Sequence, residues 1–325
     1  MASGRVPTTQ RIFGPAIAAR ECSRMRRTDP CGCGVRSDPT SSARPPPCSP
    51  TLADVLAPEF RDLFPDAEPI FVVGAARSGT TIVGNGLRFG AGIPGNREGF
   101  VYTTAYLMLA TLHERWQQIG PGIQHMADED RGDPRRERAS SRFDFDALRR
   151  DVLRHFHAIA PPQGERVWVD KTPDIYMIHA TPILAAAYPR GRWIWVQRNG
   201  IEVLDSRRRT HPEMTFEEGC HDWAMVIRDW QRARTLVSER CLEIDQRDVA
   251  TSGPETAGRI AAFLGLDGRA AEGLAEVFGR DRPGRTTTRD YRNALRLEDT
   301  DWTEAERQLF RAICAEAMAT AGYPL

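Results

Sequence analysis

The stretch Pro69–Thr81 constrains this chain most, because it combines the pattern of a buried strand with a small-residue loop and the start of a helix. Its first part, Ile70-Phe71-Val72-Val73, is a short run of β-branched and aromatic residues, which is typical of a strand buried on both faces. Gly74 and Gly79 bracket a loop of small residues, and apolar residues at helical spacing follow. We therefore predict a parallel strand, a tight loop and a helix N-terminus in direct succession.

A loop of this kind at the start of a helix is suited to binding an anion. The first backbone N–H groups of a helix have no partner within it, and small side chains let a phosphate group approach them. The loop fits the pattern G-x-x-x-x-G, but Thr80 stands where a nucleotide triphosphatase carries lysine, and Arg77 places a cation inside the loop. The pattern favours a phosphate-like anion other than the γ-phosphate of ATP. The alternative is a strand-to-helix turn that binds nothing.

The basic residues are distributed unevenly between the two types. Lysine and arginine together number 44, and Lys171 is the only lysine among them. Arginine and lysine are nearly interchangeable on a surface but not in a site, so this position calls for an explanation. The formal net charge is 0, which gives no indication of a nucleic-acid-binding protein.

Composition also bounds the class of protein and its location. Hydrophobic residues make up 41% of the chain and charged residues 27%, as in a globular protein. No apolar run has the length of a transmembrane helix, and the N-terminus lacks the apolar core of a signal peptide. The seven cysteines are scattered and show neither a disulfide framework nor the spacing of a zinc site. We expect a reduced, cytoplasmic protein with no transmembrane segment and no bound metal.

The chain divides into a tail and a domain. Residues 1–50 are rich in Arg, Ser and Pro, and we expect them to be disordered. Residues 51–325 are expected to form a single domain, in which strand patterns alternate with helical patterns, as in a parallel sheet covered by helices on both faces. We expect strands at 70–73, 167–170, 191–196 and 241–244, and helices from Thr51 and at 102–118, 145–159, 176–188, 201–209, 216–240, 253–264 and after the capping box at Thr303.

Cations follow three of the expected strands: Arg77, Lys171 and Arg198. The carboxyl ends of parallel strands meet at one edge of a sheet, where doubly wound proteins bind their ligands. Glu98 follows a Gly-rich turn at 90–97, and its carboxylate is either solvated and paired with Arg97 or a general base. The alternatives for the three cations are surface ion pairs or ordinary charges at strand ends.

Taken together, these blocks resemble the sulfotransferases that use 3′-phosphoadenosine-5′-phosphosulfate (PAPS) as donor. Arg77-Ser78-Gly79-Thr80-Thr81 resembles the 5′-phosphosulfate loop of that family, and Arg198 with Ser206 resembles its 3′-phosphate element. Asp170-Lys171-Thr172-Pro173 resembles a segment of the bacterial and tyrosylprotein branch. The chain departs from the family after the fourth strand, because Asp245-Gln246-Arg247-Asp248 lacks the tyrosine of a Tyr-Glu-Asp-like run.

The resemblance implies a role for each matched residue. The loop would bind the 5′ end of the donor, while Arg198 and Ser206 would bind its 3′-phosphate. Glu98 would take the proton of an acceptor hydroxyl that attacks in line, and Lys171 and Arg77 would stabilise the leaving phosphate. For Ser206 the alternative is a helix serine that bonds its own backbone.

The resemblance covers roughly residues 66–325, which we expect to be the core of the domain. It implies an α/β fold, a P-loop-like three-layer α/β/α arrangement with a central parallel sheet and a largely helical C-terminal half. The expected acceptor is a small-molecule, sugar or lipid hydroxyl, and a homo-oligomer is compatible with the sequence. Two other functions stay open: a P-loop kinase or nucleotide hydrolase, against which Thr80 argues, and a non-catalytic nucleotide-binding protein of the same fold.

Overall fold

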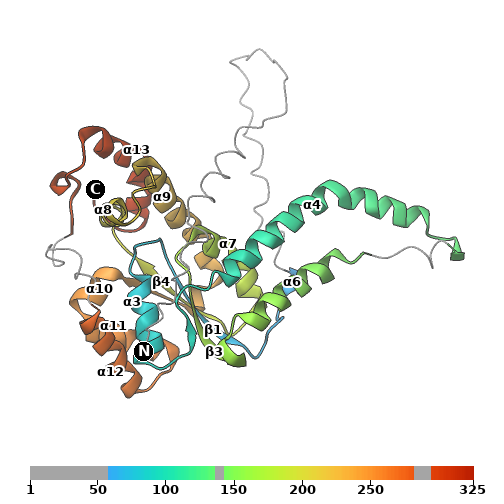
Figure 1. Cartoon of the computed structure of the whole chain (residues 1–325), viewed down its shortest axis with the longest axis horizontal. Coiled ribbons are helices and arrows are strands. Elements are labelled where there is room, and N and C mark those ends of the chain that lie inside the picture. The colour runs from blue at the N-terminus through green and yellow to red at the C-terminus, as the bar shows by residue number, and fades with distance from the viewer. Residues whose placement is uncertain (1–57, 136–142, 282–293) are drawn as a thin grey trace, which may run out of the picture.

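At the centre of the molecule lies a five-stranded parallel sheet (Figure 1). The computed structural model describes residues 58–135, 143–281 and 294–325, so the predicted tail at 1–50 and the helix start at Thr51 lie outside the described residues. The strand order is β2-β3-β1-β4-β5, which places β1 in the middle. The strands are β1 (Glu68–Val73), β2 (Gly95–Asn96), β3 (Val167–Lys171), β4 (Arg192–Gln197) and β5 (Cys241–Asp245).

Two apolar cores lie on the two faces of the sheet, because successive side chains of a strand point to opposite faces. Phe71 and Val73 of β1 belong to one core, while Ile70 and Val72 belong to the other. This explains why the strand reads as a continuous apolar run rather than as an alternating one.

Helices cover both faces of this sheet (Figure 1). The core around Phe71 contains side chains from α4 (Val101–Glu129), α6 (Phe145–Ile159), α7 (Ile175–Ala187), α8 (Gly200–Thr210), α9 (Phe216–Ala233) and α13 (Glu304–Thr320). The core around Ile70 contains side chains from α3 (Thr80–Asn85), its π-helical continuation η2 (Gly86–Gly90), α10 (Gln246–Thr251), α11 (Gly253–Leu264) and α12 (Gly268–Arg280). The predicted three-layer α/β/α, P-loop-like fold with a largely helical C-terminal half is confirmed.

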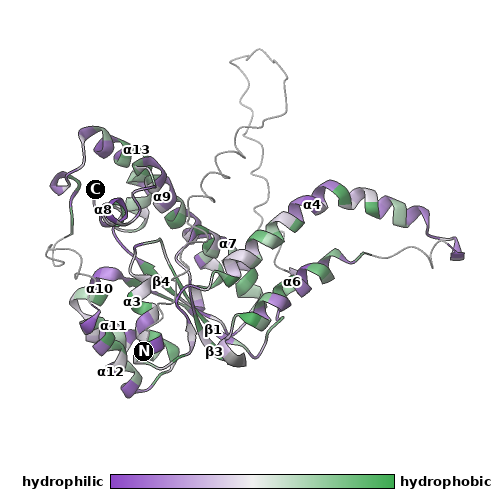
Figure 2. Cartoon of the chain, in the orientation of Figure 1, coloured by the Kyte–Doolittle hydropathy of each residue, from purple (hydrophilic) through white to green (hydrophobic). Residues whose placement is uncertain are grey.

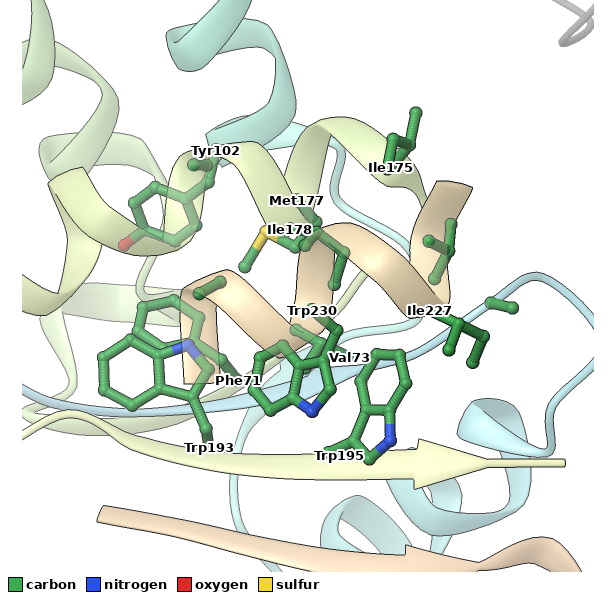
Figure 3. Packing of buried hydrophobic residues seen from close by; sticks show 14 of the residues in the cluster. Phe71, Val73, Tyr102, Ile175, Met177, Ile178, Trp193, Trp195, Ile227 and Trp230 are labelled. Atoms are coloured by element: carbon green, nitrogen blue, oxygen red, sulfur yellow. The ribbon is translucent and has the colours of Figure 1, made fainter. Parts of the chain in front are cut away.

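Tryptophan rings fill much of the core between β4 and α9 (Figure 3). Trp195 stacks on Trp230 with the ring centroids 4.6 Å apart and the planes 6° from parallel. Trp193 lies 5.0 Å from the ring of Phe71, so the aromatic packing links β4 to β1 as well as to α9. Such large buried rings fix the relative positions of these elements, and with them the loops that leave the strands.

Helix α4 is longer than predicted. We expected it to end at Gln118 and an exposed excursion to follow at 127–141, but α4 runs through Pro121 to Glu129. Residues 131–135 are exposed as expected, and residues 136–142 lie outside the described residues. The ring of Trp116 stacks on Phe145 of α6, 4.6 Å away, and this contact supports α4 where its sequence favours a helix end. The two helices extend away from the sheet together, and α4 alternates polar and apolar residues along its length (Figures 1 and 2).

A short edge strand, which the sequence did not predict, lies within the Gly-rich turn at 90–97. Gly95 and Asn96 form β2 and pair with β3, with Asn96 opposite Asp170. A Cβ atom on Gly95 would lie 2.4 Å from the carbonyl oxygen of Val169, so glycine is needed for this close approach. The pairing carries the chain to the carboxyl end of β3, and this is what places Glu98 beside Lys171.

Candidate active site

The loop between β1 and α3 has little free space around its glycines. A Cβ atom on Gly74 would lie 2.4 Å from the carbonyl oxygen of Val196 on β4. Gly79 has a φ of +96°, and a Cβ atom there would lie 2.6 Å from Cγ of Gln246. Arg77 also adopts a left-handed backbone, with a φ of 74°, which is uncommon for a residue that is not glycine. Unfavourable backbone geometry of this kind concentrates at functional sites.

Two buried polar atoms beside this loop have no hydrogen-bond partner among the described residues. They are the hydroxyl oxygen of Ser78 and the amide nitrogen of Gln246, and both side chains are 1% exposed. Buried polar groups are normally paired, and leaving one unpaired costs about 1–3 kcal/mol. Ser78 was predicted as an anion donor, and its hydroxyl is available for that role.

Arg77, Arg198 and Ser206, predicted from distant parts of the sequence, lie together at the carboxyl edge of the sheet. Nε of Arg77 donates to the hydroxyl of Ser206 at 3.1 Å, and Nη1 of Arg198 donates to the carbonyl oxygen of Arg77 at 3.1 Å. Partial burial and the nearby guanidinium groups of Arg198, Arg207 and Arg209 lower the pKa of Arg77. Like charges near Arg77 therefore disfavour its charged form, and a bound anion would offset this effect.

A carboxylate that the sequence analysis missed sits within this arginine cluster. Oε2 of Glu202 accepts from Nε of Arg198 at 3.1 Å, and Oε1 accepts from Nη2 of Arg247 at 2.8 Å and from the backbone N–H of Leu295 at 3.4 Å. Glu202 therefore orients Arg198 and ties it to the start of α10. Arg198 precedes α8 and Glu202 lies in its first turn, and this spacing of four residues is a signal that could have revealed the pair.

The predicted base and the only lysine form an ion pair. Nζ of Lys171 donates to Oε1 of Glu98, and also to the hydroxyl of Thr81 at 3.3 Å. Lys171 is 2% exposed, while the side chain of Glu98 is 41% exposed. Burial lowers the pKa of Lys171, and the hydrogen bond to Glu98 opposes this shift. The pair thus places a buried hydrogen-bond donor, Lys171, beside a carboxylate that is accessible to solvent or to a substrate.

The carboxyl group of Asp170, next to Lys171, makes the free energy of unfolding depend on pH. Burial raises the pKa of Asp170 to about 6, against the hydrogen bond from Thr172, while its ordinary value is 3.8. Between these values the folded protein holds a proton that the unfolded chain has lost, so stability falls as pH rises from about 4 to about 6.

We therefore expect Asp170→Asn, which cannot ionise, to gain stability relative to the wild type by roughly 2–3 kcal/mol between pH 4 and pH 7. Denaturant unfolding of both proteins at the two pH values measures the difference. If the two proteins differ in free energy of unfolding by the same amount at pH 4 and at pH 7, the raised pKa of Asp170 is contradicted.

Arg207 and Gln246 are further residues at this edge that sequence reasoning missed. Arg207 is 4% exposed, pairs with Asp222 at 2.6 Å and donates to the carbonyl oxygen of Ala76 in the loop at 3.5 Å. In the sequence it stands in an arginine run that looks like a solvated helix face. One feature of the sequence pointed to Gln246: it directly follows β5, at the carboxyl end of a parallel strand, where such sheets bind their ligands.

The fold and this edge together define a class of protein: a P-loop-like α/β protein with a glycine loop at its central strand and a cluster of arginines beside it. The family model described as "Sulfotransferase family" matches residues 69–270, which span β1 to α12. The chain belongs to the sulfotransferase family. No curated protein matches the sequence.

Several solved structures are similar in fold. The sulfotransferase STF9 from Mycobacterium avium is 14% identical, with 80% of this chain and 78% of that chain covered and a TM-score of 0.43. The sulfotransferase domain of the olefin synthase from Synechococcus PCC 7002 is 18% identical, with 80% and 97% covered and a TM-score of 0.46. Mouse sulfotransferase SULT7A1, complexed with PAP, is 12% identical, with 85% and 95% covered and a TM-score of 0.38. Within the described residues of this chain, no helix has the length and apolar character to cross a membrane.

Proposed function

We propose that this sulfotransferase takes its sulfuryl group from PAPS and transfers it to an acceptor hydroxyl. The observation that carries the choice of donor is the meeting of two anion-binding elements, joined by the 3.1 Å hydrogen bond from Arg77 to Ser206. PAPS carries two anionic groups at a fixed separation, a 5′-phosphosulfate and a 3′-phosphate. Two such elements at one sheet edge match a ligand of this kind.

The residues present fit the donor. The buried hydroxyl of Ser78 and the tight glycines around it suit the 5′ end, next to the N-terminus of α3. Arg198 and Ser206 suit the 3′-phosphate, because a guanidinium binds phosphate through two parallel hydrogen bonds and the hydroxyl adds a neutral donor. The Arg77–Ser206 hydrogen bond would then be exchanged for contacts with the donor.

In the proposed reaction Glu98 accepts the proton of the acceptor hydroxyl. The hydroxyl oxygen forms a bond to sulfur as the bond from sulfur to the 5′-phosphate oxygen breaks, which leaves an acceptor sulfate ester and adenosine 3′,5′-bisphosphate (PAP). The charge of the leaving phosphate grows near Lys171 and Arg77, whose positive groups stabilise it. The ion pair with Lys171 holds the Glu98 carboxylate at the sheet edge where the acceptor hydroxyl would bind.

The donor is tested by calorimetric and thermal-shift titrations of the full chain with PAP, ATP plus Mg²⁺, and AMP. A ligand at 100 times its dissociation constant adds about 2.7 kcal/mol of stability, and we expect this for PAP alone. Arg198→Ala is expected to weaken PAP binding by about 10- to 150-fold, the range for a hydrogen bond to a charged group.

The matched control for this variant is Arg154→Ala. Arg154 is an exposed arginine of α6 that pairs with Asp151, and its loss is expected to leave PAP binding unchanged. Stabilisation by ATP plus Mg²⁺ but not by PAP would reject PAPS as the donor.

A further inference from the structure

A histidine–aspartate pair lies outside the residues used so far. The Nε2 atom of His179 on α7 lies 2.8 Å from Oδ2 of Asp229 on α9, and the two side chains are 32% and 18% exposed. In the neutral ring, the hydrogen bond to Asp229 places the proton on Nε2, and Nδ1 is then a hydrogen-bond acceptor. Among the described residues, Nδ1 of His179 has no hydrogen-bond partner.

Two tyrosine rings stand around this histidine. The ring of Tyr106 on α4 lies 5.8 Å from that of His179, and the ring of Tyr176 on α7 lies 6.4 Å from both. All three side chains are partly exposed, unlike the fully buried aromatic residues of the core. Three partly exposed aromatic rings from two helices thus lie next to one another, and one of them carries a nitrogen atom with no hydrogen-bond partner among the described residues.

The position of this cluster relative to the candidate active site follows from the helices that carry it. Helix α4 begins just after Glu98, and α7 begins just after Lys171. Tyr106 and His179 lie on these helices one to two turns from their starts, at a rise of about 1.5 Å per residue. Tyr176 lies in the first turn of α7. Both helices thus start at the sheet edge that carries Glu98 and Lys171, and the cluster lies within two turns of these starts.

We propose that Tyr106, Tyr176 and His179 form an acceptor subsite for a neutral, polyhydroxylated ring, such as a glycoside. One hydroxyl reacts at Glu98, a second donates to Nδ1 of His179, and the tyrosine rings pack on the apolar C–H face of the sugar. Asp229 positions His179. This inference rests on the proposed function and names the substrate class for the same site.

Other acceptor classes fit this cluster less well. A phenol or a simple alcohol has one hydroxyl, so with that group at Glu98 it would leave Nδ1 of His179 unpaired. An anionic acceptor would approach the carboxylate of Asp174, whereas the carboxylate of Asp229 is already paired with His179 and Arg232. The carboxylate of Asp174 caps α7 through the backbone N–H of Tyr176, at the same end of the helix.

The test uses the full chain with PAPS and two sets of acceptors. The first set is the methyl glycosides of glucose, galactose, mannose and N-acetylglucosamine; the second is phenol and 1-hexanol. We expect sulfation of at least one glycoside, and no comparable reaction of the single-hydroxyl compounds. With that glycoside, His179→Phe is expected to raise KM about tenfold, the worth of one hydrogen bond, with kcat and the PAP dissociation constant nearly unchanged.

Two further variants separate recognition from a structural role. His179→Asn retains an acceptor atom on a short side chain. Its KM is therefore expected to lie closer to the wild-type value than that of His179→Phe, which a merely structural histidine would not explain. His221→Phe is the matched control, because His221 is an exposed histidine that pairs with Glu217 on α9.

The outcomes distinguish this inference from the proposed function. If PAP binds but no glycoside is sulfated, or if KM is unchanged in His179→Phe, the subsite is rejected and the donor assignment stands. If PAP does not bind the wild-type chain, the proposed function itself fails, and the subsite fails with it.

Discussion

Lys171→Met is expected to lower kcat by about 10²- to 10³-fold, the loss that follows removal of one preorganised donor to developing charge. The effect should be in kcat more than in PAP binding, because the charge on the leaving phosphate grows in the transition state. Methionine retains an unbranched apolar side chain of similar length, so the buried space under α3 stays filled. Single-turnover kinetics with PAPS measures the loss.

Lys171→Arg is also expected to lower kcat, although it keeps the positive charge. A Cβ atom on Gly84 of α3 would lie only 3.2 Å from Cγ of Lys171, which shows how closely the helix covers this side chain. The planar guanidinium group is larger than an ammonium group and fits this covered position poorly. Activity of Lys171→Met near the wild-type value would show that Lys171 is an ordinary charge at a strand end.

Glu98→Gln is expected to lower kcat by about 10²- to 10⁴-fold, since it removes the proposed general base. The amide oxygen of glutamine still accepts a hydrogen bond from Lys171, so the pair keeps its geometry while the basic oxygen is lost. PAP should bind to the variant as it does to the wild type, because Glu98 lies on the acceptor side of the loop in the proposed site. The rate is measured with PAPS and saturating acceptor.

The control for this variant is Glu114→Gln, at an exposed position of α4 away from the sheet edge. It is expected to retain full activity. If Glu98→Gln retains the wild-type rate while PAP binding is intact, another group is the base, and the ion pair with Lys171 is structural.

Local patterns predicted the regular elements well, because the forces that form them act over a few residues. Helix α6 has the predicted bounds, α11 ends at Leu264 with Gly265 in a left-handed conformation, and Thr303 forms the predicted capping box with Glu306. The apolar run of β1 predicted a strand buried on both faces, and both cores contain its side chains.

Predictions were wrong where contacts distant in sequence outweighed local propensity. Helix α4 continues past Gln118 because Trp116 stacks on Phe145 of another helix. Helix α9 ends at Ala233 rather than Arg240, and two short 3₁₀ turns lead into β5.

The sequence by itself determined the types of residue that could form the site and the strand ends that carry them. Arg77, Lys171 and Arg198 each follow a strand pattern, and parallel strands bring their carboxyl ends to one edge. The only lysine in an arginine-rich chain marked a position where the two residues are not equivalent. These inferences need only local pattern and elementary charge chemistry.

Only the tertiary structure decided which of these groups touch. The two-residue strand β2 is too short to predict, yet its pairing with β3 brings Glu98 to Lys171. The strand order places β4 next to β1, and this brings Arg198 to the backbone of Arg77. Strand order depends on which apolar faces pack together across the whole chain, and that information is not contained in any single segment of the sequence.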